Sequence, residues 1–248
     1  MSLSLDAYRT LIRSALDAGF KPAGFGREPW RGRTLMLRHD VDYSLDLAVA
    51  LAQVNAKLDV SGTFFVLARA HSYNPRSRKS LERLAELHAL GQKLGVHVAG
   101  GEEDIAADFE SLASHLPVEK VFSWHNPTPA VMDASRDREV VAGLTNVYSK
   151  RFLEDALYRS DSNFDRSFEQ LVTAFASGAD AVHMLIHPIN WVAGGDSMLD
   201  VFEHAWPYLI REAELEARTN RVYAARFPDG MPDSVLADFA RRWREAAG

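Results

Sequence analysis

The chain has 248 residues, of which 47% are hydrophobic and 25% charged. This composition is typical of a globular protein that buries a core without disulfides. Lys and Arg number 28 against 34 Asp and Glu, a net charge of −6, so no basic surplus favours nucleic acid or an anionic membrane as a partner. Because cysteine is absent, a metal site would need histidine and carboxylate ligands.

Residues 1–20 predict an amphipathic helix and no export signal. Charged side chains recur there at Asp6, Arg9, Arg13 and Asp17, which breaks the apolar core that a signal peptide needs. Nowhere does an uncharged apolar run approach the ~20 residues of a membrane-spanning helix. We therefore expect a cytoplasmic protein without a membrane span.

Short apolar segments alternate with amphipathic helical segments along the chain. The expected strands cover residues 35–37, 62–67, 93–98, 120–124, 145–148, 157–160 and 181–186. The expected helices cover residues 8–16, 44–58, 80–90, 105–116 and 168–175, then a helical end interrupted at Pro207 and a last stretch at 234–243. Such alternation predicts a helix-covered parallel sheet in a single barrel, with an open doubly wound sheet as the alternative.

Ionisable residues interrupt the apolar runs at the carboxyl ends of the expected strands. They are His39, Asp40, Asp42, His97, His125, Asp161, His183 and His187. The carboxyl ends of parallel strands meet on one face, where α/β enzymes carry their sites. We therefore expect one polar site built from several strands.

Asp40 and Asp42 lie two residues apart on an extended segment, so their side chains project to the same side. Like charges held close together need a cation or a shared proton, and a metal would supply the cation. The structural alternative is that Asp42 caps a helix and Asp40 pairs with Arg38. Both interpretations stay open on these residues alone.

The histidines divide between site and core. His97 closes its strand, and a lone histidine there is more often a hydrogen-bonded core residue. His125 leads abruptly into the turn at Asn126, which favours a binding role. His183 and His187 are four residues apart and face the same side of a strand; His187, at the strand end, is the site candidate, and His183 is expected in the core.

Four ordered segments resemble the polysaccharide deacetylase superfamily, the NodB-homology domain of carbohydrate esterase family 4. They are His39-Asp40-Val41-Asp42, Gly62-Thr63-Phe64-Phe65-Val66, Gly91 to His97, and Leu185-Ile186-His187-Pro188. The resemblance is to a divergent branch whose first motif also reads HDVD. It implies an α/β fold, a distorted (β/α)7 barrel with a helical C-terminal end, forming one domain over residues 1–248 with its motif core at about 35–191.

The resemblance also implies a mechanism and site residues. Members use a divalent metal, commonly zinc, to hydrolyse an N-acetyl group on a sugar. By the motifs, Asp40 corresponds to the catalytic base, Asp42 and His97 to metal ligands, and His187 to the general acid.

One position departs from the family pattern. Members carry a second histidine four residues after the first, where this chain has Gly101. We hypothesise that His125 supplies this third ligand instead. The HDVD branch is associated with bacterial surface-polysaccharide gene sets, so we expect an amino-sugar precursor carrying an acetyl or formyl group as substrate.

Neighbouring residues are candidates for substrate binding or for supporting the site. Trp124 and Trp191 stand beside the proposed site residues and would offer a sugar platform, although core packing is the expected role of such side chains. Asp161 would orient His125 or His187, or would be an ordinary turn residue. His39 is grouped with these supporting candidates.

Two other functions remain open. A barrel that has lost its metal and its activity would bind a carbohydrate, and Gly101 makes this alternative credible. Asp40-Val41-Asp42 after an apolar strand also resembles the nucleophile motif of aspartyl-phosphate phosphatases. That class needs a later acidic pair and a lysine, neither of which stands out at a later strand end.

Overall fold

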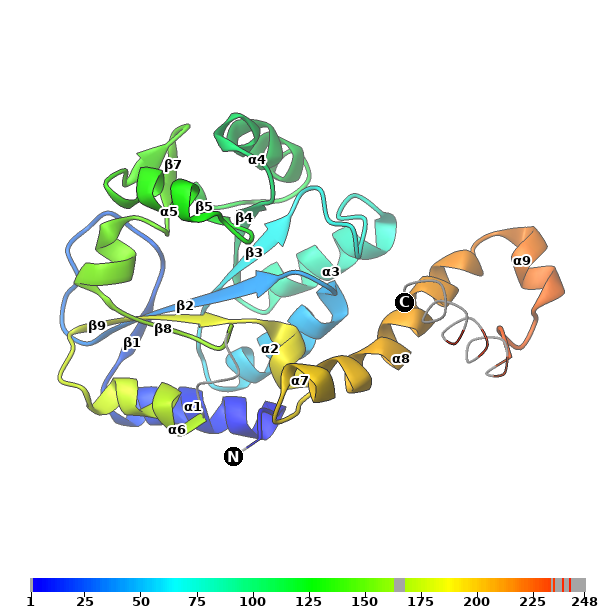
Figure 1. The fold of residues 1–248 in the computed structure, drawn as a ribbon, viewed down its shortest axis with the longest axis horizontal. Helices are drawn as coiled ribbons and strands as arrows, with labels where there is room; N and C mark the ends of the chain where they lie inside the picture. The colour runs from blue at the N-terminus through cyan, green and yellow to red at the C-terminus, as the bar shows by residue number, and fades with distance from the viewer. Residues whose placement is uncertain (1, 163–167, 233, 235–237, 239–240, 242–248) are drawn as a thin grey trace. The chain divides into compact units, whose positions relative to one another are not determined.

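One curled, mostly parallel β-sheet of nine strands forms the framework of the first part of the chain (Figure 1). The structure is a computed structural model that describes residues 2–162, 168–232, 234, 238 and 241. The chain divides into two compact units, Met1–Val201 and Phe202–Gly248. The whole sheet and the motif core lie in the first unit.

Each of the seven expected strands is present, several with shifted ends, and two short strands were not expected, β1 and β6. The strands are β1 (Lys21–Ala23), β2 (Thr34–Val41), β3 (Thr63–Leu67), β4 (Lys93–Val98), β5 (Val121–Trp124), β6 (Val140–Val141), β7 (Leu144–Asn146), β8 (Leu157–Ser160) and β9 (Ala181–Ile186). The α-helices are α1 (Leu5–Asp17), α2 (Leu45–Lys57), α3 (Arg78–Ala89), α4 (Ile105–Ala113), α5 (Pro129–Arg136), α6 (Phe168–Val172), α7 (Pro188–Val192), α8 (Met198–Ala217) and α9 (Arg221–Arg226).

The strand order is β6-β7-β5-β4-β3-β2-β9-β8, with β1 also paired to β2. The pairs are parallel except β6 with β7, which is antiparallel. Within the described residues β6 and β8 end the path without joining, so the expected barrel is open and the sheet forms a half-barrel. At one end of the sheet, β7 is followed by the short antiparallel strand β6.

Side-chain alternation along β2 decides which residues face the inside of the curl. Leu35 and Leu37 pack in the core beneath α1 and α2, whereas Met36 packs with Phe25 and Phe65 on the opposite, concave face. Arg38 and Asp40 follow Met36 at two-residue spacing and therefore share the concave face. The strand thus carries charged groups into the interior of the half-barrel.

Helices cover the outer face, and their ends agree only in part with the sequence predictions. Ser44 caps α2 by accepting a hydrogen bond from the Leu47 amide, and α1 and α6 pack side by side (Figure 1). The helix expected to reach residue 116 ends at Ala113. The predicted break at Pro207 is wrong, because α8 continues through it at the expense of one helical hydrogen bond.

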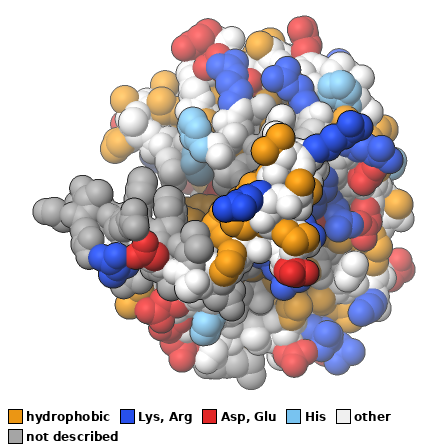
Figure 2. All heavy atoms as spheres, turned by 90° about the vertical axis from the view of Figure 1, so that its right-hand side faces the viewer, with side chains coloured by type: hydrophobic (Ala, Val, Ile, Leu, Met, Phe, Trp, Pro, Cys, Tyr) orange, Lys and Arg blue, Asp and Glu red, His pale blue; other side chains and the backbone are white. Residues whose placement is uncertain are grey.

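Two further sequence predictions concern the last helix of the chain and the absence of a membrane span. The last expected helix, at residues 234–243, lies mostly outside the described residues. Among the described helices, none has the length and apolarity to cross a membrane. On the face shown in Figure 2, acidic and basic side chains of the described residues are interspersed.

His39 and His183 are buried in the core as neutral side chains. His39 stacks on Phe64 on the outer face and lies 2.9 Å from the Tyr8 hydroxyl; since that hydroxyl donates to Asn55, His39 Nε2 donates to it. His183 Nδ1 donates to the Phe152 carbonyl, 3.0 Å away, which confirms its expected core role. Burial lowers the pKa of each histidine to about 3.

These two histidines predict a specific acid sensitivity. The unfolded chain protonates them below about pH 6.5, whereas the folded protein keeps them neutral down to a pKa of about 3. The stability is therefore fully present above about pH 6.5 and falls as the pH drops, by about 1.4 kcal/mol per pH unit for each histidine. Chemical denaturation between about pH 5.5 and pH 4.5 measures this slope, because His125 and His187, whose pKa values are raised, are protonated there in both the folded and the unfolded chain.

The His183→Phe variant removes one of the two titrating groups and should show about half of the wild-type slope. A wild-type free energy of unfolding that stays constant over this pH range would contradict the assignment.

Candidate metal centre

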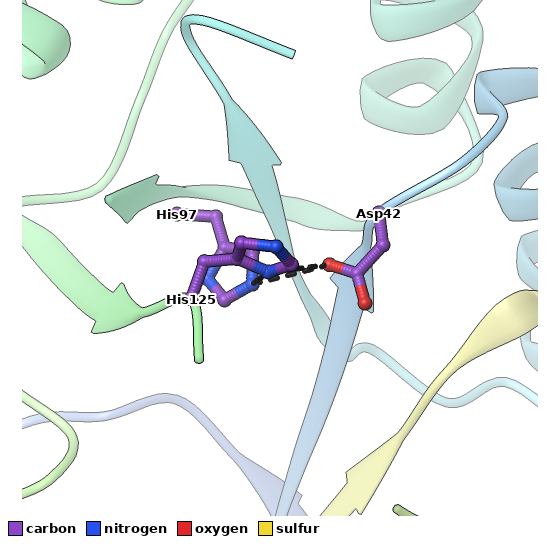
Figure 3. A group of neighbouring side chains, drawn as sticks. All are labelled: Asp42, His97 and His125. Atoms are coloured by element: carbon purple, nitrogen blue, oxygen red, sulfur yellow. Dashed lines mark hydrogen bonds and ion pairs between the residues drawn. The ribbon is translucent and has the colours of Figure 1, made fainter. Parts of the chain in front are cut away.

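Three side chains from the ends of three strands converge on one point (Figure 3). Asp42 is the first residue after β2, His97 lies near the end of β4, and His125 is the first residue after β5. His97 Nε2 lies 3.2 Å and His125 Nδ1 3.3 Å from Asp42 Oδ1, and the two nitrogens are 3.2 Å apart. These three residues could hold a metal ion.

The spacing of the three atoms fits the donor set of a transition metal. Bonds of about 2.0–2.1 Å in a tetrahedron place neighbouring ligand atoms ~3.3–3.4 Å apart, close to the observed edges of 3.2 to 3.3 Å. Asp42 Oδ1 is also buried without a well-oriented hydrogen-bond donor among the described residues. Two imidazoles and one carboxylate would leave a further coordination position open.

The electrostatics of the cluster keep Asp42 ionised. Burial would raise the pKa of Asp42, but the facing imidazoles of His125 and His97 outweigh it and hold that pKa well below its usual range. Conversely, the Asp42 carboxylate raises the pKa of His125. The cluster therefore attracts positive charge, as a cation site must.

Polar neighbours hold both imidazoles in place. His97 Nδ1 lies 2.7 Å from Ser123 Oγ on β5. His125 Nε2 lies 3.1 Å from the side-chain nitrogen of Asn126, a residue whose positive φ of 46° turns the chain sharply after β5. In each ring the second nitrogen faces the cluster.

Asp40 lies at the edge of the cluster in a different environment. Both of its oxygens accept from Arg38, at 2.7 Å from Nε and 2.6 Å from Nη2, and Oδ2 lies 3.6 Å from His97 Nε2. Burial would raise the pKa of Asp40, but the Arg38 guanidinium holds it below its usual range. The pairing of Asp40 with Arg38 is the one that the structural alternative anticipated.

His187, the first residue after β9, approaches the cluster from another side. Its Nε2 lies 3.8 Å from Asp42 Oδ2, and its Nδ1 lies 2.6 Å from Asp161 Oδ1. Asp161 Oδ2 accepts from the His187 amide at 2.9 Å and from Trp191 Nε1 at 2.7 Å. Burial would lower the pKa of His187, but the Asp161 carboxylate outweighs it and raises that pKa to about 9.

Two candidates from the sequence do not join the site. His39 lies on the outer face, as described above, and Trp124 packs in a core cluster with its indole donating to Ser135 at 2.9 Å. Trp191 is fully buried, so it supports Asp161 and offers no exposed platform for a sugar. Gly101, where the motif resemblance would place a second histidine, precedes a short 3-10 turn, Glu102–Asp104.

Sequence reasoning missed two neighbours of the cluster, Ser123 and Asn126. Ser123 stands two residues before His125, and this spacing places both side chains on the same face of an extended strand. The register that pairs Ser123 with His97 across β4 and β5 is set by the whole sheet. No local sequence pattern therefore predicts this contact.

Comparisons with protein-family models, with curated proteins and with solved structures found no match to this chain. The resemblance to polysaccharide deacetylases thus remains a prediction from the order of four motifs.

The pair formed by His187 and Asp161 generates a direct test. Replacing Asp161 by Asn removes the charge that opposes burial, so the pKa of His187 should fall from about 9 by about two units or more. An NMR titration of the His187 imidazole in metal-free protein measures this shift.

The Trp191→Phe variant is the matched control, because it removes one hydrogen bond from Asp161 and leaves the charge in place. It should shift the pKa of His187 by less than about one unit. If Asp161→Asn leaves that pKa unchanged, a different group controls His187.

Proposed function

We propose that this protein is a metal-dependent hydrolase that removes an acetyl or formyl group from the nitrogen of an amino sugar, as a step toward a surface polysaccharide. The observation that carries the hydrolase proposal is the triangle of Asp42, His97 and His125, with Asp40 on one side and His187 on another. The order of the deacetylase-like motifs supports the choice of an N-acylated sugar.

Zinc suits a donor set of two imidazoles and one carboxylate, and when bound it would polarise the substrate carbonyl and a water molecule. In hydrolysis, water adds to the acyl carbon and the bond from carbon to nitrogen breaks. A carboxylate and a free amine result. The protein must therefore accept a proton from water and supply one to the departing nitrogen.

Asp40 and His187 suit these two proton transfers. Asp40 is ionised and fixed by Arg38, so it is ready to accept the proton of the attacking water. His187, with its pKa raised to about 9, is protonated at neutral pH and its Nε2 points toward Asp42. It is ready to donate a proton to the amine, and Asp161 keeps it oriented.

The arrangement is less suited to the two other functions. A phosphatase of the aspartyl-phosphate type needs a lysine and a later acidic pair near the first aspartate, whereas the described side chains that reach Asp40 and Asp42 from later strands are histidines. A carbohydrate-binding protein without metal does not need three converging ligand atoms, one of which, Asp42 Oδ1, is buried without a well-oriented hydrogen-bond donor among the described residues. Metal binding therefore separates the proposal from that alternative.

One prediction of the proposed function concerns the zinc content of the protein. Protein incubated with zinc and then desalted should retain about one ion per chain, as measured by elemental analysis. The His125→Ala variant removes one corner of the triangle and should bind zinc at least about 100-fold more weakly. His115→Ala, at an exposed turn after α4, is the matched control and should retain the ion.

Equal zinc content in the His125→Ala and His115→Ala variants would exclude His125 as a ligand.

A second prediction concerns the proton acceptor. Asp40→Asn is nearly isosteric but cannot take a proton from water, so it should lower kcat by about 10²- to 10⁴-fold while zinc content stays near one ion per chain. Release of acetate or formate from N-acylated amino sugars measures the rate. Wild-type protein that holds zinc but releases no acid from any N-acylated amino sugar would contradict the hydrolase proposal.

A further inference from the structure

A buried serine lies behind the metal-facing side of His97. Ser123 is on β5, its side chain is fully buried, and its Oγ lies 2.7 Å from His97 Nδ1. We propose that Ser123 is a positioning residue that holds the His97 ring with Nε2 facing the metal site and accepts the hydrogen bond from Nδ1–H when a metal is bound. This inference rests on the metal centre of the proposed function and assigns a role to a residue outside the ligand set.

The argument begins with the two nitrogens of a neutral imidazole, of which one carries the proton and the other a lone pair. A metal in the triangle needs the lone pair on His97 Nε2, the nitrogen that lies 3.2 Å from both Asp42 Oδ1 and His125 Nδ1. The proton must then sit on Nδ1. Because His97 is buried, that N–H needs an acceptor within the protein, and Ser123 Oγ is in place to accept it.

A hydroxyl suits this role because it can reverse its hydrogen bond. Without metal, the carboxylates of Asp42 and Asp40, 3.2 and 3.6 Å from Nε2, favour a proton on that nitrogen. Ser123 can then donate to Nδ1. With a metal on Nε2, the hydroxyl would rotate and accept the hydrogen bond from Nδ1–H. A carboxylate or a carbonyl at this position could only accept.

The surroundings of Ser123 argue against a role in packing alone. All four residues of β5, Val121–Trp124, are buried, and a hydroxyl placed among apolar side chains costs free energy unless it is hydrogen-bonded. His97 stands directly across the strand pair from Ser123 in the β4–β5 register. The contact is thus built into the sheet and fixes the ring on a rigid element.

Zinc affinity tests the proposal without any activity measurement. Competition with a chelator gives the zinc dissociation constant of the wild type and of Ser123→Ala, which should bind about 10- to 100-fold more weakly because Nδ1–H loses its acceptor. Ser80→Ala is the matched control: Ser80, on α3, is also buried, but its hydroxyl pairs with that of Ser77, the N-cap residue of the helix. It should keep wild-type affinity within about twofold.

The protonation pattern of the ring is the second measurement. Long-range proton–nitrogen NMR spectra show which imidazole nitrogen carries hydrogen, and in zinc-loaded wild type His97 should carry it on Nδ1. Thermal melting of the metal-free variants verifies that both serine variants are folded.

The outcomes separate this inference from the proposed function. Wild-type protein that binds no zinc overturns the metal centre and the role of Ser123 with it. Wild-type protein that binds zinc, combined with unchanged affinity in Ser123→Ala or with His97 protonated on Nε2 in the zinc-loaded state, overturns the role of Ser123 alone.

Discussion

Compensation of buried negative charge is the constraint on which the rest of this structure depends. Three carboxylates, Asp40, Asp42 and Asp161, lie buried or nearly so at the carboxyl ends of strands in one half-barrel. A buried carboxylate is tolerated only when it is paired or strongly hydrogen-bonded. Each of the three is compensated in a different way, and these differences give each its proposed role.

Asp40 and Asp161 are compensated by the protein itself. Arg38 holds both oxygens of Asp40, and His187 and Trp191 hold those of Asp161. Among the described residues, Asp42 faces the imidazoles of His97 and His125 and, at 3.8 Å, that of His187, and its Oδ1 has no well-oriented donor. A bound cation would complete this compensation, and the fixed carboxylate and imidazole on either side would then serve as proton acceptor and donor.

Local patterns in the sequence predict much of this arrangement. Apolar runs bounded by turn residues locate the strands, and the ionisable residues after them locate the edge of the sheet where the cluster lies. Side chains alternate between the two faces along β2, so Arg38, Asp40 and Asp42 share one face. His39 lies between Arg38 and Asp40 in the sequence and therefore belongs to the opposite, outer face. Grouping His39 with the site ignored that alternation.

Longer-range features could not be predicted from the sequence. The contact between Ser123 and His97 depends on strand register, and one end of the sheet is β6, a two-residue strand too short to recognise from its composition. The burial of Trp191 depends on packing of α1 against α7, which brings Tyr8 against its ring at 5.5 Å. Such contacts join segments far apart in the chain.

The most direct test of the account is a crystal structure of the zinc-soaked protein with anomalous diffraction data at the zinc edge. The account predicts a peak bonded to Asp42 Oδ1, His97 Nε2 and His125 Nδ1 at ~2.0–2.1 Å. A zinc ion bound to other residues, or no peak within this triangle in a crystal that contains zinc, would contradict it.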